Sequence, residues 1–218
     1  MTKLIDILVL FSLMCFCACT DYAQQIKDEF EPDDASGSSA TTEDNPLPSY
    51  GYMTDERDGR WYSTVNIAGQ VWMAENLNFD TGKSYCYDND DRNCDIAGRL
   101  YEFKDAFVAA CPDGWHLPSA EEFEILIKNT GGDVNAESLK SASDWDGNNS
   151  SGFNAYPAGQ KRFADNYTDM GSYAYFWSAT QDGANAYALM ISGSLSVASV
   201  VIEPINMEQA FSVRCVKD

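Results

Sequence analysis

Two acidic segments carry the side chains best suited to hold a hard metal cation. Residues 88–91 read DNDD, and residues 144–149 read DWDGNN, with the alternating oxygens of a calcium loop but no Glu at its twelfth position. Oxygen ligands of this kind are what calcium requires. Turns rich in Asp and Asn are more often simply solvated, so we expect no cofactor. If calcium does bind, the candidate ligands are Asp88, Asp90, Asp91, Asp144, Asp146 and Asn148.

His116 is the single histidine of the chain, and it lies between Trp115 and Leu117 just before a predicted helix. A catalytic base needs an orienting partner and a position that faces the substrate. A hydrogen-bonded structural role is more common for a lone histidine, so we interpret His116 as structural. A phosphate-binding glycine loop, a nucleophile elbow and a glycosidase carboxylate pair are not recognisable. The sequence therefore predicts a protein that is not an enzyme.

Four cysteines fall in the part of the chain that is predicted to fold: Cys86, Cys94, Cys111 and Cys215. In an exported protein, an even number of cysteines indicates disulfides before metal ligands. Of the three pairings, we favour Cys86–Cys94, which flanks a short polar loop, together with Cys111–Cys215, which would close about 100 residues. A zinc site is the alternative, but the chain has a single histidine and no Cys-x-x-Cys pair to build it.

Aromatic side chains can stack on sugar rings, and the chain has five Trp and twelve Tyr residues. Trp72, Trp115 and Trp177 occupy strand-like or core-like positions, and we assign them to the core. Trp145 and Tyr156 fall in the long segment between the predicted helix and the last strands. They are the candidates for exposure and for contact with a ligand.

The N-terminus has the pattern of an export signal. Residues 4–19 read LIDILVLFSLMCFCAC, an apolar run that contains Asp6 and is shorter than the roughly 20 residues of a spanning helix. A small residue precedes Cys19, which resembles a bacterial lipobox, although Phe16 stands where Leu is usual. Cleavage without lipidation is the alternative. We expect a lipoprotein signal peptide over residues 1–18, a lipid on Cys19, and export to the cell envelope, in the outer membrane.

Charge and composition separate a tether from a domain. The 218 residues include 14 Lys and Arg against 34 Asp and Glu, a net charge of −20, which argues against nucleic acid as a partner. Residues 19–49 are acidic and contain few apolar residues, which predicts a disordered tether. The aromatic content of 13% is too high for a wholly disordered chain. Residues 50–218 are therefore expected to form one folded domain.

Periodicity and turn residues predict the elements of that domain. Strands are expected at 61–67 and 70–74 around an Ala-Gly turn, and again at 173–180, 184–191, 195–203 and 210–216. Helices are expected over 100–110 and from a capping box at Ser119 and Glu122 to the glycines at 131–132. Two helices between antiparallel strands predict an α+β domain.

Several sequence blocks occur in a characteristic order. They are 54–59 (TDERDG), 62–77 (YSTVNIAGQVWMAENL), 98–101 (GRLY), 111–119 (CPDGWHLPS), 152–159 (GFNAYPAG), 176–180 (FWSAT) and 212–216 (SVRCV). This series resembles the Fibrobacter succinogenes major paralogous domain family over about residues 54–218. Many members of that family look like lipoproteins.

Three of these blocks, 114–118, 176–180 and 213–216, also resemble the C-type-lectin-like fold, including its formylglycine-generating branch. The resemblance implies a single compact domain with two packed helices and long loops. The formylglycine-generating branch needs free thiols, which the expected disulfides would consume. Lectin calcium sites use Glu-Pro-Asn, whereas residues 203–206 read EPIN, so calcium-mediated sugar binding is not implied.

Together these features predict a cell-envelope lipoprotein whose domain is a non-catalytic binding or adhesion module. Its lipid would hold it in the membrane, and polysaccharide or another envelope protein is the expected partner. The alternative is a structural or assembly protein of the envelope that binds another protein.

Overall fold

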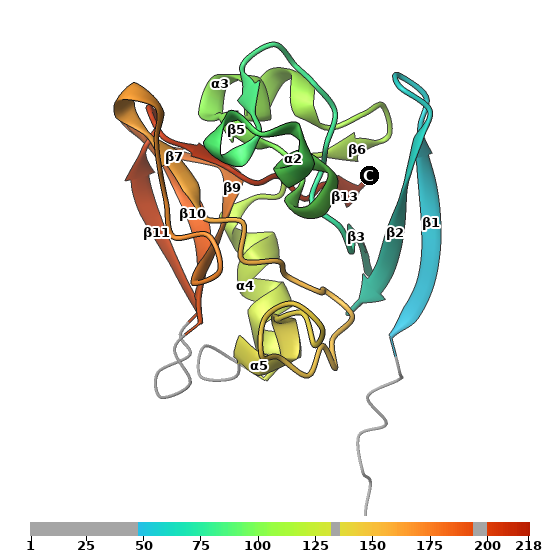
Figure 1. Ribbon diagram of the computed structural model, residues 1–218. Coiled ribbons are helices and arrows are strands. Elements are labelled where there is room, and N and C mark those ends of the chain that lie inside the picture. Colours follow the sequence, from blue (N-terminus) through green and yellow to red (C-terminus); the bar gives the residue numbers. More distant parts are fainter. Residues whose placement is uncertain (1–47, 132–135, 194–199) are drawn as a thin grey trace, which may run out of the picture. The chain divides into compact units, whose positions relative to one another are not determined.

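The computed structural model describes residues 48–131, 136–193 and 200–218, which belong to one unit spanning residues 46–218 (Figure 1). The predicted signal peptide, the lipidation site at Cys19 and the tether up to residue 47 lie outside the described residues. The same is true of residues 195–199 of a predicted strand and of the glycine at 132. Among the described residues, no helix has the length and apolar character needed to cross a membrane.

The described strands form three antiparallel sheets. The first has the order β1 (Ser49–Asp55), β2 (Arg60–Ile67), β3 (Gln70–Met73), β13 (Val216–Lys217) and β6 (Trp115–His116). The second has the order β11 (Val200–Asn206), β10 (Asn185–Ser192) and β9 (Tyr173–Asp182). The third has the order β4 (Ser84–Tyr85), β5 (Leu100–Glu102), β12 (Ala210–Phe211), β7 (Gln160–Arg162) and β8 (Asn166–Thr168).

The helical segments are short. They are η1 (Tyr87–Asn89), α2 (Asp91–Ala97), α3 (Phe103–Asp105), the π-helical η2 (Ala106–Ala110), α4 (Ala120–Asn129), α5 (Ala136–Leu139) and η3 (Phe163–Asp165). Helices and antiparallel sheets together confirm the α+β class.

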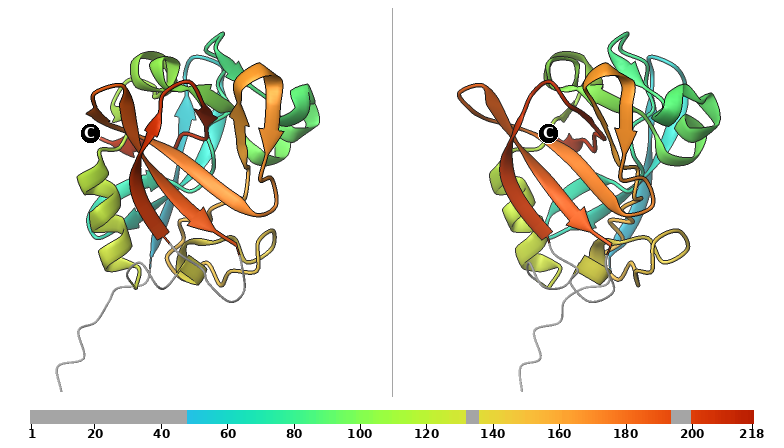
Figure 2. Two further views of the ribbon diagram at one scale, coloured as in Figure 1. Left: turned by 90° about the vertical axis from the view of Figure 1, so that its left-hand side faces the viewer. Right: turned by 60° about the vertical axis from the view of Figure 1, so that its left-hand side comes forward.

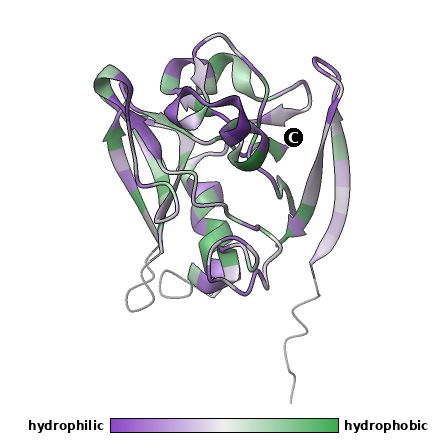
Figure 3. Ribbon diagram, in the orientation of Figure 1, coloured by the Kyte–Doolittle hydropathy of each residue, from purple (hydrophilic) through white to green (hydrophobic). Residues whose placement is uncertain are grey.

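Helix α4 lies between the β9–β11 sheet and the first sheet, as Figures 1 and 2 show. It carries both hydrophobic and hydrophilic residues (Figure 3), and it buries Phe123 and Leu126. The ring of Phe123 stacks on that of Trp72 in β3, with the centroids 5.4 Å apart. The predicted capping box is present, because Ser119 accepts from the N–H of Glu122 and the Glu122 carboxylate accepts from the N–H of Ser119.

The predicted β2–β3 hairpin is also confirmed. Ile67 pairs with Gln70 across a two-residue turn, and both turn residues have positive φ, 53° at Ala68 and 86° at Gly69. A turn of this kind matches the twist of the strands that it joins.

Two sequence-based predictions of elements are wrong. Residues 100–110 do not form one helix, because Leu100 and Tyr101 are both buried in β5, which pairs with β4 and β12 before the helical turns begin. The predicted strand 210–216 is divided into β12 and β13, which belong to different sheets. Long-range pairing overrides local propensity at both places.

The cysteine pairing is as predicted. Disulfides join Cys86 to Cys94, at an S–S distance of 2.01 Å, and Cys111 to Cys215, at 2.07 Å. The first encloses η1 and the start of α2, a helix that the sequence analysis did not anticipate.

The core is rich in aromatic rings. Trp72 and Trp177 are fully buried, as expected, while Trp115 is half-buried. The Trp177 ring lies 4.3 Å from that of Phe211, and its Nε1 donates to the carbonyl oxygen of Tyr101 at 2.8 Å. These contacts join the second and third sheets.

Candidate functional site

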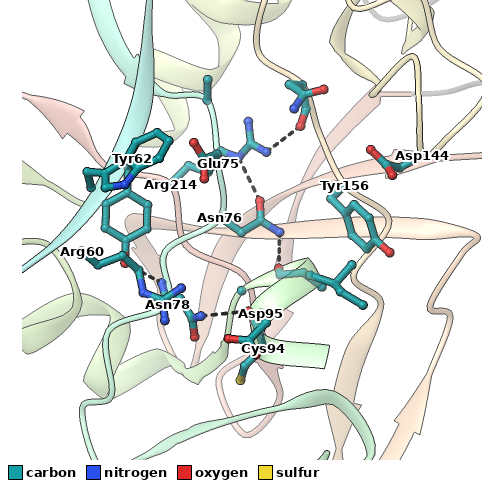
Figure 4. A pocket seen from close by; sticks show the side chains of 16 residues that line it. Arg60, Tyr62, Glu75, Asn76, Asn78, Cys94, Asp95, Asp144, Tyr156 and Arg214 are labelled. Atoms are coloured by element: carbon teal, nitrogen blue, oxygen red, sulfur yellow. Dashed lines mark hydrogen bonds between the residues drawn. The ribbon is translucent and has the colours of Figure 1, made fainter. Parts of the chain in front are cut away.

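A pocket of about 360 Å³ opens between β2, the segment that follows β3, helix α2 and the loop that contains residues 144–156 (Figure 4). Its lining combines aromatic rings, amides, carboxylates and guanidinium groups. The lining residues that carry the argument below are Arg60, Trp61, Glu75, Asn76, Tyr156 and Arg214.

Asn76 forms what we call the floor of the pocket, and its side chain is hydrogen-bonded to three other residues. Its Oδ1 accepts from Nε of Arg214 at 2.9 Å. Its Nδ2 donates to the carbonyl oxygen of Ala97 at 2.8 Å, and a longer contact of 3.3 Å reaches the hydroxyl of Ser212. Because Asn76 is buried, these bonds hold the floor in one conformation.

Arg214 places a buried positive charge beneath this floor. Its Nη2 donates to the carbonyl oxygen of Asn154 at 2.8 Å, and its Nη1 donates to that of Phe153. The guanidinium carbon lies 4.4 Å from the centre of the Phe153 ring. Burial lowers the pKa of Arg214 to about 9, while the charge of Glu75 acts in the opposite direction. The group therefore stays protonated at neutral pH.

Gly98 allows α2 to approach the floor closely. Its φ is +72°, and a Cβ at this position would lie 2.7 Å from Cβ of Asn76 and 2.8 Å from the carbonyl oxygen of Leu77. A larger residue would have to displace the segment that carries Asn76.

The mouth of the pocket is aromatic. Trp61 is 65% exposed, and Tyr156 is half-buried. Burial, and then the charge of Asp144, raise the pKa of Tyr156. Both phenol and indole groups combine an apolar face with a polar edge, which suits a ligand with both kinds of surface.

Three further polar side chains of the pocket, those of Glu75, Asn78 and Tyr62, are hydrogen-bonded within the protein. Oε1 of Glu75 accepts from the N–H of Ser63 at 2.8 Å, and Nδ2 of Asn78 donates to the carbonyl oxygen of Cys94 at 2.9 Å. The hydroxyl oxygen of Tyr62 accepts from the N–H of Asn78 at 3.1 Å, and burial raises the pKa of Tyr62 to about 12. These groups are rigid neighbours for a ligand.

The structure brings together two residues singled out from the sequence and separates a third from them. Tyr156, a candidate for ligand contact, and Asp144, a candidate metal ligand, both line the pocket. The expected exposure of Trp145 is wrong, because its side chain is only 4% exposed and lies in the core. The loop folds back so that Lys140 bridges to Ala155, and Nζ of Lys140 lies 5.0 Å from the Trp145 ring.

The acidic side chains of the two candidate calcium segments are not gathered into a site. Asp90 caps α2, accepting from the N–H of Arg92 at 3.0 Å, and forms an ion pair with the same arginine. Oδ1 of Asn148 accepts from the N–H of Ser150 at 2.9 Å. Asp88, Asp91 and Asp146 are exposed. Within the described ranges, no three His, Cys, Asp or Glu residues are grouped so that they could hold a metal ion. The expectation that the protein has no cofactor stays a prediction.

His116 lies outside the pocket lining, between two carboxylates. Its Nε2 is 2.9 Å from Oε1 of Glu122, and its Nδ1 is 2.7 Å from Oδ1 of Asp218. Burial alone would lower the pKa of His116, but the hydrogen bonds and charges of Glu122 and Asp218 together raise it. The two carboxylates hold the imidazole in one orientation, and the structural role expected for His116 stays a prediction.

Sequence reasoning missed Trp61, Asn76 and Arg214 as site residues. Arg214 did carry a signal, since it is the one charged residue of the block 212–216, whereas Asn76 is one of several polar residues in the block 62–77. Trp61 carried no such signal in the sequence, because its exposure depends on which other parts of the fold pack against β2.

A protein-family model described as the Fibrobacter succinogenes major domain matches residues 65–217. The match includes most of the pocket lining, though not Arg60, Trp61 and Tyr62. Comparison with curated proteins found no match, and neither did comparison with solved structures. The resemblance to the C-type-lectin-like fold therefore stays a prediction.

Proposed function

The chain belongs to the Fibrobacter succinogenes major domain family, and we propose that this member is a non-catalytic binding module of the bacterial cell envelope. In this proposal the pocket takes one sugar unit of a polysaccharide. The observation that carries the proposal is the exposed Trp61 and the half-buried Tyr156 at the mouth of a pocket with a polar floor.

Sugar rings combine an apolar face with a rim of hydroxyl groups. An indole or phenol ring can cover the face, while amides, carboxylates and guanidinium groups exchange hydrogen bonds with the rim. The pocket has both kinds of group within about 360 Å³, which is in the range of small-molecule sites.

Binding without turnover is favoured by how the polar groups are used. Three of the five N–H donors of Arg214 are used by Asn76 and two carbonyl groups, and Oε1 of Glu75 accepts from the backbone N–H of Ser63. His116 lies away from the pocket and is held by Glu122 and Asp218. A general base must lie within hydrogen-bond reach of the substrate, so His116 is not placed to act on a sugar held in this pocket.

The envelope location rests on the N-terminal sequence. The apolar run that ends at Cys19 supports export, and a lipid on Cys19 would anchor the protein in the outer membrane. The mass of the mature protein from bacterial membranes checks this proposal. A mass that matches an unmodified chain would contradict the lipid anchor.

The binding proposal is tested on a glycan array with the full chain, with and without calcium. We expect retention of polysaccharide fragments that Trp61→Ala weakens by about tenfold or more. The matched control is Phe163→Ala, which removes an aromatic side chain that is 60% exposed and does not line the pocket. An array without any retained glycan in either condition would contradict the proposal.

A second candidate is a protein partner, which the position of β1 favours. β1 is an edge strand of the first sheet, and its free backbone groups could pair with a strand of another chain. Purification from membranes distinguishes the two candidates. A stoichiometric protein partner, lost on substitution of Gly51 by Pro in β1, would favour this second function.

A further inference from the structure

Three exposed aromatic residues on β1 and β2 form a row that leads to the pocket. Tyr50 is 64% exposed, Tyr52 is 80% exposed and Trp61 is 65% exposed. We call these three residues the aromatic row. Aromatic side chains of this size are usually buried, so their concentration on one hairpin calls for an explanation.

The pairing of β1 with β2 places all three side chains on one face of the sheet. Tyr50 pairs with Val65, Tyr52 with Ser63, and Thr54 with Trp61. Residues two apart in a strand, and residues directly opposite across a pair, share a face. Tyr50 and Tyr52 are therefore about 7 Å apart along the strand, and Trp61 is a diagonal neighbour of Tyr52.

The row meets the pocket at Trp61, and its other end lies against the loop that helps to line the pocket. Trp61 itself lines the pocket. At the other end, Tyr50 packs on Gly152, where a Cβ would lie 2.8 Å from the tyrosine ring and its hydroxyl. Gly152 is followed by Phe153 and Asn154, and Asn154 is another lining residue. Tyr52 lies between these two contacts and does not line the pocket.

The chemistry of the row favours a polyhydroxylated chain over an apolar partner. Two of its three members are tyrosines, and Thr54 and Ser63 add hydroxyl groups on the same face. Most of β1 is pale in Figure 3, so the strand is aromatic without being strongly apolar. Rings for stacking, with hydroxyl groups between them, match the alternation of ring faces and hydroxyls along a polysaccharide.

The charges of the pocket lining and of the whole chain favour an uncharged polysaccharide over an acidic one. The pocket lining has three carboxylates, from Glu75, Asp95 and Asp144, against the two guanidinium groups of Arg60 and Arg214. Three of the five N–H donors of Arg214 are already used within the protein. Since the chain as a whole carries a net charge of −20, an acidic polysaccharide would be repelled at long range as well.

Resting on the proposed function, we infer that the pocket and the aromatic row form one extended site for an uncharged polysaccharide chain. One sugar unit occupies the pocket, and the following units stack on Trp61, Tyr52 and Tyr50. The row precedes residue 65, the first residue matched by the family model, so family membership alone does not imply it.

The test measures the affinity of the full chain for uncharged oligosaccharides of one to six units by isothermal titration. The series is taken from a neutral polysaccharide, such as a soluble glucan or a xylan, that the glycan array retains. For the wild-type chain, we expect affinity to rise with length. Tyr52→Ala should leave the affinity for one or two units unchanged and reduce the affinity for the longest by about two- to tenfold. Phe163→Ala, the control, should change neither.

The outcomes separate the two proposals. If none of these oligosaccharides binds at any length, the proposed function fails and this inference fails with it. If short fragments bind but longer ones bind no better, or if Tyr52→Ala leaves all lengths unchanged, the pocket stands and the extended site is overturned. Equal affinity for an acidic polysaccharide such as polygalacturonate overturns the restriction to uncharged chains. If Tyr52→Ala only abolishes self-association in the ultracentrifuge, the row is an interface between copies.

Discussion

Nδ1 of His116 lies 2.7 Å from Oδ1 of Asp218, which joins strand β6 to the end of the chain beyond β13. The same imidazole lies 2.9 Å from the capping-box residue Glu122 through its other nitrogen. One side chain thus holds together a sheet edge, a helix N-terminus and the C-terminal segment.

Stability should depend on the charge of His116. Its pKa is raised above the ordinary value of 6.5 in the folded state, so the imidazolium stabilises the fold in full below pH 6.5. That stabilisation is lost as the pH rises through the folded-state pKa. We expect the free energy of unfolding of the wild-type chain to fall in this window, and that of His116→Gln to be flat there.

The single histidine makes the measurement direct, because NMR should show one titrating imidazole. Asp218→Asn removes one carboxylate and should lower the pKa of His116 toward 6.5. A pKa for His116 at or below 6.5 in the wild-type chain would contradict the role assigned to its two partners.

The two disulfides should differ in their effect on stability. Cys111 and Cys215 are 104 residues apart, whereas Cys86 and Cys94 are 8 apart. In the loop-entropy description, removing the disulfide that closes the longer loop lowers the free energy of unfolding by about 4–5 kcal/mol. Removing the disulfide that closes the shorter loop lowers it by about 2.5 kcal/mol. Denaturant unfolding of the two double Cys→Ala variants checks this order, and equal losses would argue against it.

Arg57 should be needed to keep the β1–β2 turn in place. It donates to both carboxylate oxygens of the buried Asp55, at 2.8 and 2.6 Å, and to the carbonyl oxygens of Ala109 and Ala110. Arg57→Ala leaves Asp55 without its partner and should cost about 2–3 kcal/mol of unfolding free energy.

Arg57→Lys is the matched variant for this prediction, because it keeps the charge but loses the forked geometry. It should recover only part of the stability lost in Arg57→Ala. Full recovery by Lys would show that charge alone, without the bidentate contact, is sufficient.

Gly98 should tolerate substitution poorly. Gly98→Ala combines a positive φ with a close contact to Asn76, and it should cost about 3 kcal/mol or more. Gly82 also has a positive φ, +89°, but a Cβ there would meet nothing within 4 Å, so Gly82→Ala should cost only about 1–2 kcal/mol. Thermal unfolding compares the two, and equal losses would show that backbone strain alone decides both.

The sequence alone was sufficient to predict those elements that depend on residues close together in the chain. The turn at Ala68 and Gly69 and the capping box at Ser119 follow from residues within a few positions of each other. The α+β class and the disulfide pairing were also predicted, the latter from the short polar loop that Cys86 and Cys94 flank.

Features that depend on distant segments were not predictable in this way. Tyr101 belongs to a strand because Phe211 of β12, more than 100 residues later, pairs with it, and Leu100 pairs with Tyr85 of β4. Trp145 is buried because Lys140 and Ala155 close the loop around it. The pocket joins Asn76 to Arg214, 138 positions apart, and no local pattern indicates that contact.

Both disulfides close loops that begin after β2, so the β1–β2 hairpin lies outside every covalent ring of the described chain. Tension that reached the domain through the residues before Ser49 would therefore act first on the seven backbone pairs between these two strands. After these backbone pairs had separated, the segment between Cys111 and Cys215 could not lengthen as long as the disulfide between the two cysteines was intact. Extension would therefore stop short of the residues between Cys111 and Cys215, and Tyr50 and Tyr52 would be pulled away with the strand that carries them.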